Sequence, residues 1–311
     1  MGCYNEHTET KRGDLVKKML FIMNPHAGMR KANRYLTEIL SIFNRGGYDV
    51  MVHMTAGPGD GTDTVARLAP EMDVVVCCGG DGTFNEMING VLRCGADVLL
   101  GYIPAGSTND FATSLKLPTN ILVAARAIVE GEAQVYDVGL FAERYFCYVA
   151  SFGMFTKASY ATSQNMKNLL GHTAYLLSGI QELSQLHTTH MRLELDDGQV
   201  IEDDFLFGAI SNSRSVGGIL TLDAKKVDMS DGKCELLLVR SPKDLVELSE
   251  CIQALQNQKY NCRMITFCPV TSVRAIGDPQ VIWTLDGERA EGQAVVEIQN
   301  IHHAIRLIQR G

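Results

Sequence analysis

The residues best suited to chemistry lie in a glycine-rich turn, Gly79-Gly80-Asp81-Gly82-Thr83, which follows the apolar run Val74–Cys78. Glycine lets backbone N–H groups approach an anion closely, and the start of a following helix adds a partial positive charge. The turn therefore suits a phosphate group. Asp81 adds a negative charge to such a site, which favours a bound Mg²⁺ or a proton transfer over simple phosphate docking. Taken alone, the motif also fits a strand-to-helix turn that needs glycine only for steric reasons.

Three further loops follow predicted strands and carry similar residues. They are Asn24-Pro25-His26-Ala27-Gly28, the turn from Thr55 to Asp60, and the segment Pro104–Phe111. Because the carboxyl ends of parallel strands meet at one edge of a sheet, we expect the four loops to form one site for a nucleoside triphosphate. Its candidate contacts are Asn24, Thr55, Gly79, Gly80, Gly82, Thr83, Gly106, Ser107 and Asn109.

Charged residues in these loops point to metal and phosphoryl chemistry. Asp81 and Asp110 lie in neighbouring loops, and Mg²⁺ commonly takes one or two carboxylates besides phosphate oxygens and water. Asp110 also fits a helix N-cap. Glu86 is a further nucleotide-side candidate, although it could simply face the positive end of a helix. Arg30 fits either a solvated side chain or a cation that neutralises the transferred phosphate.

The elements that position these loops alternate through the first half of the chain. Apolar runs predict strands at 18–23, 48–54, 74–78 and 98–103, and helical spacing predicts helices at 32–43, 62–69 and 84–92. This order predicts an α/β domain with a parallel, doubly wound sheet. After Asp137 the pattern becomes mostly β, with strands at 191–195, 205–210 and 234–239 and helices at 168–186 and 245–256. We expect the site in a cleft between the two halves.

The composition restricts the class of protein. The 311 residues are 46% hydrophobic and 21% charged, which is typical of a globular protein of about two domains. The formal net charge of −8 argues against a nucleic-acid partner. The sequence has no apolar run of ~18 residues, no secretory signal pattern and no cysteine spacing of a metal or disulfide framework. A cytoplasmic protein fits best.

Taken together, the segments at 79–86 and 104–111 resemble the catalytic domain of the diacylglycerol kinase family, which includes sphingosine and ceramide kinases, and are most similar to its soluble bacterial members. The resemblance continues through 136–139, 211–218, 228–232 and 285–288. It implies a Rossmann-like amino-terminal domain and a mostly β-sandwich carboxyl-terminal domain. The limits it implies are a loose tail at 1–15, a nucleotide-binding domain at 16–137, a lipid-substrate domain at 138–298, and a segment at 299–311 that returns to the first domain.

The resemblance also implies roles for single residues. Asp81, Asp110 and Asp137 match an acidic Mg²⁺-ATP network, and Asn24, Arg30, Thr55, Gly80, Gly82, Thr83 and Ser107 match nucleotide contacts. Glu288 matches the general base, with Asp81 as the alternative, and Asp286 is assigned to the nucleotide side. Asp228, Asp231 and the carbonyl of Lys233 match a structural metal site. The Asp-Gly pairs at 231–232 and 286–287 also fit simple hairpin turns.

The implied activity is transfer of the γ-phosphoryl group of ATP, with Mg²⁺, to a lipid hydroxyl. Diacylglycerol is the leading acceptor and phosphatidic acid the product. Such an enzyme would visit a membrane surface transiently and peripherally, and a homodimer is a candidate assembly. Two alternatives stay open: an NAD kinase, which shares the Gly-Gly-Asp-Gly-Thr turn, and a catalytically silent lipid-binding protein on the same scaffold. The apolar segments 152–155 and 175–177 fit either an acyl pocket or core.

Overall fold

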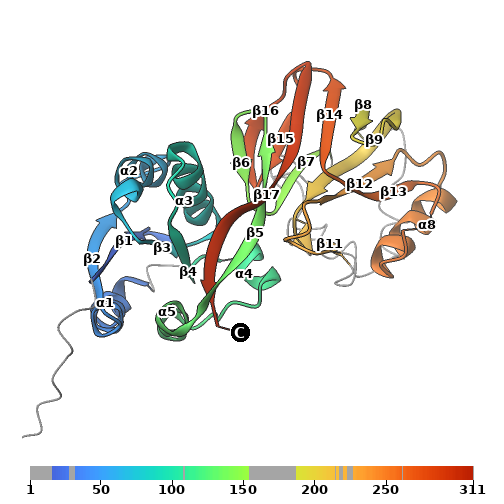
Figure 1. Cartoon of the computed structure of the whole chain (residues 1–311). Coiled ribbons are helices and arrows are strands. Elements are labelled where there is room, and N and C mark those ends of the chain that lie inside the picture. Colours follow the sequence, from blue (N-terminus) through green and yellow to red (C-terminus); the bar gives the residue numbers. More distant parts are fainter. Residues whose placement is uncertain are drawn as a thin grey trace, which may run out of the picture.

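The computed structural model in Figure 1 describes residues 16–27, 32–107, 109–153, 187–213, 215–216, 220–222, 227–260 and 262–310. Several sequence-based expectations fall outside these ranges. They are the role of Arg30, the helix at 168–186, the Gly217-Gly218 pair and the apolar segment at 175–177.

A parallel sheet forms the amino-terminal half. Its strands are β1 (Lys17–Met23), β2 (Tyr48–Met54), β3 (Val74–Gly79) and β4 (Leu99–Pro104), in the spatial order β2-β1-β3-β4. Every residue of β3 is buried, which explains its run of β-branched and other apolar residues without alternation. The predicted parallel sheet is confirmed.

Helices cover both faces of this sheet (Figure 1). Helices α2 (Asp60–Leu68) and α3 (Asp81–Cys94) pack in the core cluster that contains Leu20 and Ile22 of β1. Helices α1 (Leu36–Arg45) and α5 (Ile121–Glu130) pack in the cluster that contains Met19 and Phe21. Neighbouring side chains of a strand therefore enter different cores, and the sheet is doubly wound as predicted. The remaining short helices are η2 (Ala32–Tyr35), η3 (Ala69–Glu71) and α4 (Asp110–Ser114).

Antiparallel strands dominate the second half, as predicted, and α8 (Leu245–Gln256) forms over the expected residues. Alternate residues of β12 again face different clusters, because Leu236 and Leu238 join Trp283 while Leu237 and Val239 join the helix-covered core. The strands are β5 (Glu132–Phe141), β6 (Arg144–Phe146), β7 (Val149–Gly153), β8 (Thr189–Leu195), β9 (Val200–Ser211), β10 (Ser215–Val216), β11 (Leu220–Thr221), β12 (Cys234–Arg240), β13 (Ile265–Val270), β14 (Ser272–Gly277), β15 (Ile282–Leu285), β16 (Glu288–Glu291) and β17 (Val295–Gln309).

Two long strands join the halves. Strand β5 runs across residue 137, and it pairs antiparallel with β17 from end to end. The last residues of β17 also lie beside the amino-terminal sheet, where Leu307 pairs in parallel with Leu100 of β4. Within the described residues, one hydrogen-bonded sheet therefore continues from β2 at one edge to β16 at the other (Figure 1).

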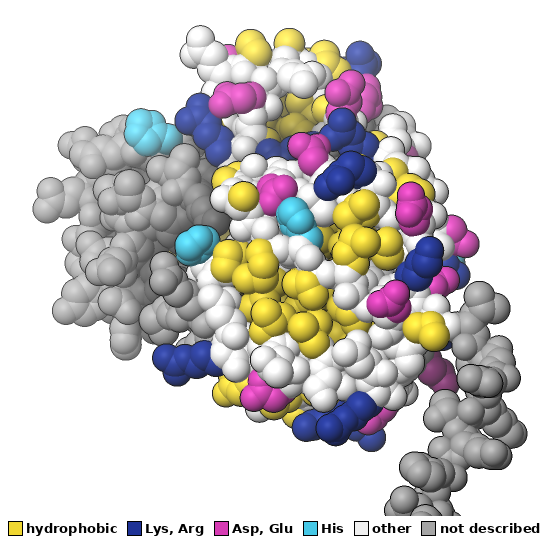
Figure 2. Space-filling model, turned by 90° about the vertical axis from the view of Figure 1, so that its left-hand side faces the viewer, with side chains coloured by type: hydrophobic (Ala, Val, Ile, Leu, Met, Phe, Trp, Pro, Cys, Tyr) yellow, Lys and Arg dark blue, Asp and Glu magenta, His cyan; other side chains and the backbone are white. Residues whose placement is uncertain are grey.

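Strand β2 is an edge strand with an unusual exposed surface. In the part of the chain that the structure describes, it pairs only with β1, and Met51, Val52 and Met54 are exposed, Met51 to 47%. Figure 2 shows hydrophobic side chains gathered on the face of the molecule where β2 lies. Among the same described residues, no helix combines the length and apolar character required to span a membrane.

Candidate active site

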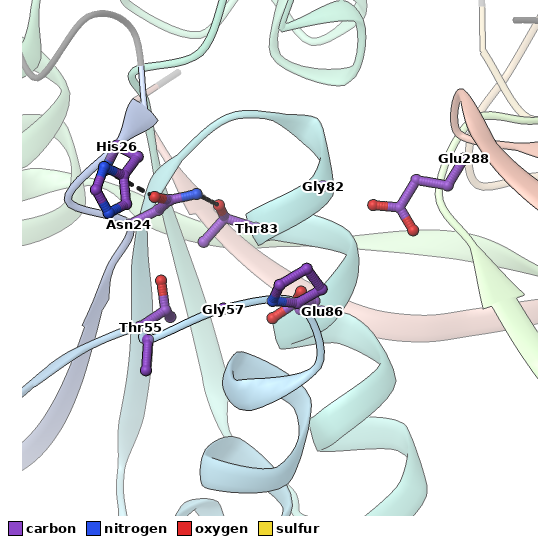
Figure 3. A pocket seen from close by; sticks show the side chains of 10 residues that line it. Asn24, His26, Thr55, Gly57, Gly82, Thr83, Glu86 and Glu288 are labelled. Carbon is purple, nitrogen blue, oxygen red and sulfur yellow. Dashed lines mark hydrogen bonds between the residues drawn. The ribbon is translucent and has the colours of Figure 1, made fainter.

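A cavity of about 280 Å³ opens at the carboxyl ends of the parallel strands (Figure 3). Its walls come from the loops after β1 and β2 and from the start of α3, which follows β3, and one side chain, Glu288, comes from β16 in the second half. The lining residues are Asn24, His26, Thr55, Ala56, Gly57, Pro58, Gly82, Thr83, Glu86 and Glu288. Three of the four predicted loops thus meet in one cleft, and both halves contribute to it.

The glycines of the 79–83 turn serve two different purposes. A Cβ atom on Gly79 would lie 2.4 Å from Thr83 Oγ1, and one on Gly106 would lie 2.5 Å from the Cα atom of Gly80. These positions need glycine for packing, as the steric reading proposes. A Cβ atom on Gly82 would instead lie 3.2 Å from Glu288 Oε1 across the cavity. Gly82 therefore keeps the space between α3 and β16 open.

Polar side chains line the side of the cavity formed by β1 and α3. Asn24 Nδ2 donates to Thr83 Oγ1 at 3.3 Å, and Asn24 Oδ1 accepts from the backbone N–H of His26 at 2.9 Å (Figure 3). Thr55 follows β2 and lines the same space. Asn24, Thr55 and Thr83, which the sequence assigned to nucleotide contacts, are brought together.

Glu86 lines the cavity and also binds a helix end. Its two carboxylate oxygens accept hydrogen bonds of 2.9 Å from the N–H groups of Gly59 and Gly61, at the start of α2. Glu86 therefore faces the positive end of a helix, as the alternative to a nucleotide contact predicts, and the helix is α2. A carboxylate in this position stabilises the helix. The same N–H groups are consequently engaged by protein, not left open to a phosphate.

Asp81 connects the third and fourth loops. Its carboxylate accepts hydrogen bonds from the N–H groups of Asp110 at 3.1 Å and Phe111 at 3.4 Å, at the start of α4. Burial raises the pKa of Asp81 to about 6, and the neighbouring carboxylates of Asp110 and Asp286 raise it as well. The charge of Asp110 acts on Asp81, and a divalent cation would offset the repulsion between the two carboxylates, so both residues fit the metal role.

The fourth loop is braced by Asn109. This residue has a positive φ of 53° and stands at the N-cap of α4. Its side chain accepts from the N–H of Gly106 and donates to the carbonyl of Gly106, both at 3.0 Å. The N-cap alternative for Asp110 is wrong, because Asp110 is the first residue inside the helix. Ser107 is exposed at the tip of this loop.

Asp286 links the two halves and is not among the residues that line the cavity. Its buried carboxylate accepts from Asn85 Nδ2 at 2.8 Å and from the N–H groups of Cys147, Tyr148 and Val149 at 2.5, 2.9 and 3.0 Å. Burial raises the pKa of Asp286, and these hydrogen bonds oppose the rise. The expected nucleotide contact does not fit a carboxylate engaged by four protein donors. Asp286 instead fixes the turn that carries Glu288.

The turn itself is the predicted two-residue hairpin. Leu285 pairs with Glu288, and Asp286 and Gly287 have φ of 50° and 80°, as a type I′ turn requires. Glu288 Oε2 accepts from Arg144 Nη2 at 2.8 Å, and its side chain is half exposed. The sequence did not point to Arg144, since no motif marks it, and it gave no role to Asn85, which lies inside the segment 79–86.

Asp137 lies in a different environment from Asp81. Its fully buried carboxylate accepts from the N–H of Gly232 at 2.7 Å, Asn300 Nδ2 at 3.0 Å, His302 Nδ1 at 3.0 Å and the N–H of His303 at 2.7 Å. The expected single network of Asp81, Asp110 and Asp137 is therefore not formed through direct contacts. Asp137 joins the loop at 228–233 to β17.

The loop with the expected structural metal ligands is acidic and partly unsatisfied. Asp231 Oδ1 accepts from the N–H of Lys233 at 3.0 Å, and Asp228 Oδ1 accepts from Ser230. Burial is the main cause that raises the pKa of nearby Glu235 to about 8. The negative charges of Asp231 and Asp228 raise this pKa further. Glu235 Oε2 is buried and, in the described part of the chain, has no hydrogen-bond partner. Carboxylate and carbonyl oxygens are the ligands that a hard divalent cation prefers, so the metal site at Asp228, Asp231 and the carbonyl of Lys233 stays a prediction.

Comparison with known proteins identifies the family. Residues 18–141 match the family model of the diacylglycerol kinase catalytic domain. The diacylglycerol kinase of Bacillus subtilis (strain 168) is 30% identical over 295 residues, which cover 94% of this chain and 96% of that protein. The diacylglycerol kinase of Staphylococcus carnosus (strain TM300) is also 30% identical over 295 residues, with 94% of each covered. This chain belongs to the diacylglycerol kinase family.

The family resemblance drawn from the motifs is thus confirmed, and the enzyme class is lipid kinase. Solved structures share the fold. Two crystal structures from Bacillus anthracis str. Sterne, one described as a diacylglycerol kinase, match with TM-scores of 0.77 and 0.73 at 23% identity, and both comparisons cover 94% of this chain and 97% of the other. The chain therefore shares its fold with these two structures over nearly its whole length.

Proposed function

We propose that the chain transfers the γ-phosphoryl group of ATP, bound with Mg²⁺, to the hydroxyl of diacylglycerol and yields phosphatidic acid. The observation that carries the proposal is that Glu288 of β16 and Gly82 and Thr83 of α3 line one cavity. A carboxylate on one wall faces glycine and threonine groups suited to phosphate on the other. That arrangement supports phosphoryl transfer between two substrates that enter from different sides.

ATP would be held by the strand-end loops. Gly80, Gly82 and Thr83 offer close backbone approach and a hydroxyl, and Asn24 and Thr55 offer further polar contacts. Asp81 and Asp110 would hold the metal. When bound, Mg²⁺ neutralises charge on the phosphate oxygens and favours departure of ADP. Both residues then act by binding the ion and orienting the donor.

Glu288 is the better general base of the two candidates. Its side chain is half exposed and faces the cavity, whereas the carboxylate of Asp81 is engaged by the N–H groups that start α4. As the lipid oxygen bonds to the γ-phosphorus and the bond to ADP breaks, the hydroxyl proton passes to Glu288 Oε1. The other oxygen, Oε2, keeps its hydrogen bond to Arg144, which holds the carboxylate in position.

We also propose that the enzyme meets its lipid at a membrane surface by transient, peripheral contact. A diacylglycerol molecule stays in the bilayer, so the cleft must approach the surface. Vesicle sedimentation tests this point. We expect binding to vesicles that contain diacylglycerol and release after its conversion, whereas retention that withstands repeated washing would contradict a transient contact.

The deciding experiment is transfer of γ-³²P from ATP in mixed micelles that contain diacylglycerol, sphingosine or phosphatidylglycerol, with NAD as a soluble acceptor. We expect label in diacylglycerol only, and a loss of at least about 10²-fold in the Glu288→Ala and Asp81→Ala variants. Label in NAD alone would identify an NAD kinase. An absence of label in every acceptor would favour a silent lipid-binding protein, and unchanged variants would remove the roles assigned to these residues.

A further inference from the structure

Two histidines and an aspartate meet at the irregular stretch of β17, away from the cavity. One ligand atom each from Asp137, His302 and His303 can be chosen so that all three lie within 4.8 Å of one another. Asp137 is fully buried, and both histidines are exposed. The cluster therefore has a fixed, charged base and an accessible outer side.

The local backbone explains why neighbouring histidines lie together. Successive residues of a regular strand point to opposite faces. The pairing of β17 with β5 shifts register between Ile301 and Ile305, and His303 has a positive φ of 50°. This bulge turns the two rings to the same side, where their centroids are 3.6 Å apart.

The distances suit a small cation with nitrogen and oxygen ligands. His302 Nδ1 and Asp137 Oδ1 are 3.0 Å apart. Ligand atoms about 2.0–2.1 Å from a tetrahedral Zn²⁺ are roughly 3.3 Å apart, so an ion could replace the proton between these two atoms with little movement. The ring of His303 would need a modest rotation, which its exposure permits.

Outer contacts already orient the carboxylate. Asp137 Oδ2 accepts from the N–H of Gly232 and from Asn300 Nδ2, so the carboxylate is held through one oxygen while the other, Oδ1, contacts His302. Hydrogen bonds of this kind to a ligating carboxylate are typical of protein metal centres. The hydrogen bonds from Gly232 and Asn300 therefore fix the position of the Asp137 carboxylate before an ion binds.

An unsatisfied oxygen lies beside the cluster. Asn300 donates its amide Nδ2 to Asp137, but its Oδ1 is buried and has no hydrogen-bond partner among the described residues. A buried amide oxygen without a partner is destabilising unless water or an ion reaches it. This oxygen could serve as a fourth ligand or bind a metal-bound water.

We propose that Asp137, His302 and His303 bind a borderline transition-metal cation of the Zn²⁺ class. Imidazole ligands favour such ions over Mg²⁺, so this site differs in chemistry from any Mg²⁺ bound with ATP. On binding, Nδ1 of His302 gives up its proton, which moves to Nε2 through solvent, because a nitrogen that holds a metal carries no proton. The ion would tie the irregular middle part of β17 to β5 and to the loop at Gly232. The proposal does not depend on the lipid that is phosphorylated.

Isothermal titration of untagged, chelator-treated protein with ZnCl₂ in excess Mg²⁺ tests the site. We expect stoichiometric binding of one Zn²⁺ per chain, weakened at least about tenfold in His302→Gln and in His303→Gln. Co²⁺ provides a second measurement, because visible absorption bands of tetrahedral Co²⁺ should appear in the wild type and be lost in both variants. Circular dichroism verifies that the variants are folded.

His187→Gln is the matched control, since His187 is another exposed histidine and should leave the titration unchanged. Retention of full Zn²⁺ affinity in a His302→Gln/His303→Gln double variant would overturn the proposal. So would an absence of Zn²⁺ binding to the wild type, or displacement of Zn²⁺ by Mg²⁺ at comparable concentration.

Discussion

Asn85 and Asp286 are joined by a 2.8 Å hydrogen bond that links α3 of the first half to the β15–β16 turn of the second. The two residues are 201 positions apart in the chain. Glu288 follows Asp286 by two residues, so this contact determines where the proposed base stands relative to Gly82. Catalysis should therefore depend on a residue that does not touch the substrates.

Asp286→Asn tests this dependence. The amide would place an NH2 group, itself a donor, among the four donors that surround this side chain, so we expect a loss of about 3 kcal/mol in the free energy of unfolding. The kinase rate should fall at the same time, because the turn under Glu288 is displaced. Urea denaturation and single-turnover phosphoryl transfer measure the two effects. Wild-type values in both would show that Asp286 has no positioning role.

Asp81 should make stability depend on pH. Its pKa of about 6 lies above the ordinary value of 3.8, so the folded protein holds this proton more tightly than the unfolded chain does. Its ionisation therefore destabilises the fold increasingly as pH rises from about 4 to 6, by at most about 3 kcal/mol. Asp81→Asn removes the effect, so stability of the variant relative to wild type should increase over that range. A pH-independent difference between the two unfolding curves would contradict the shifted pKa.

The same residue should limit activity in acid. Only the ionised carboxylate binds Mg²⁺ well, so phosphoryl transfer should increase as Asp81 loses its proton near pH 6. Higher Mg²⁺ concentration should move this transition to lower pH, because the cation favours the charged form. A rate profile that is flat from pH 5 to 8 at several Mg²⁺ concentrations would argue against metal binding by Asp81.

Gly82→Ala separates the glycine that serves the cavity from those that serve packing. Alanine favours the helix by about 1 kcal/mol over glycine, so stability should hold or rise. The added methyl would lie 3.2 Å from Glu288 Oε1 and crowd the space for phosphate, so activity should fall roughly tenfold or more. In contrast, Gly106→Ala should lower the stability of the fold, because its Cβ would clash with the backbone of Gly80. Thermal unfolding and transfer rates on both variants distinguish these outcomes.

Arg144→Gln tests whether the guanidinium positions Glu288. Without the 2.8 Å contact the carboxylate gains freedom, so kcat should fall roughly tenfold while KM for ATP changes little. Arg93→Gln is a suitable control, because Arg93 forms an exposed ion pair with Asp63 on the surface. A rise in KM without a fall in kcat would point to substrate binding by Arg144 instead.

The sequence predicts the elements better than it predicts their contacts. Strands β1 to β4, β8, β9 and β12 and helix α8 follow from apolar runs and spacing, whereas strands such as β7, β14 and β15 are not predicted. Helix α3, however, begins at Asp81, three residues before the apolar pattern does, because glycines hide the helical turn and long-range contacts stabilise it. Asp60 likewise starts α2 ahead of the expected residue 62, where Glu86 supplies acceptors from another helix.

The site residues likewise fall into those that the sequence predicts and those that it does not. Residues in the turns that follow predicted strands, such as Asn24 and Thr83, could be assigned to the cavity from the order of strands and helices alone. The partners of Asp137, Asp286 and Glu86 could not, because each carboxylate is satisfied by donors distant in sequence. Residue type predicts that a buried carboxylate needs donors, but only the folded topology determines which ones are near.

Strand β17 has a consequence for how the protein is made. The parallel strands β1 to β4 precede β17 in the chain, so the amino-terminal sheet is synthesised before Leu307, the residue that pairs with Leu100 at the edge of β4. Until then that edge is open to pairing with other chains, which favours aggregation during synthesis. Nascent chains that lack β17 should therefore be held by chaperones, and the edge of β4 should be covered only after β17 has been made.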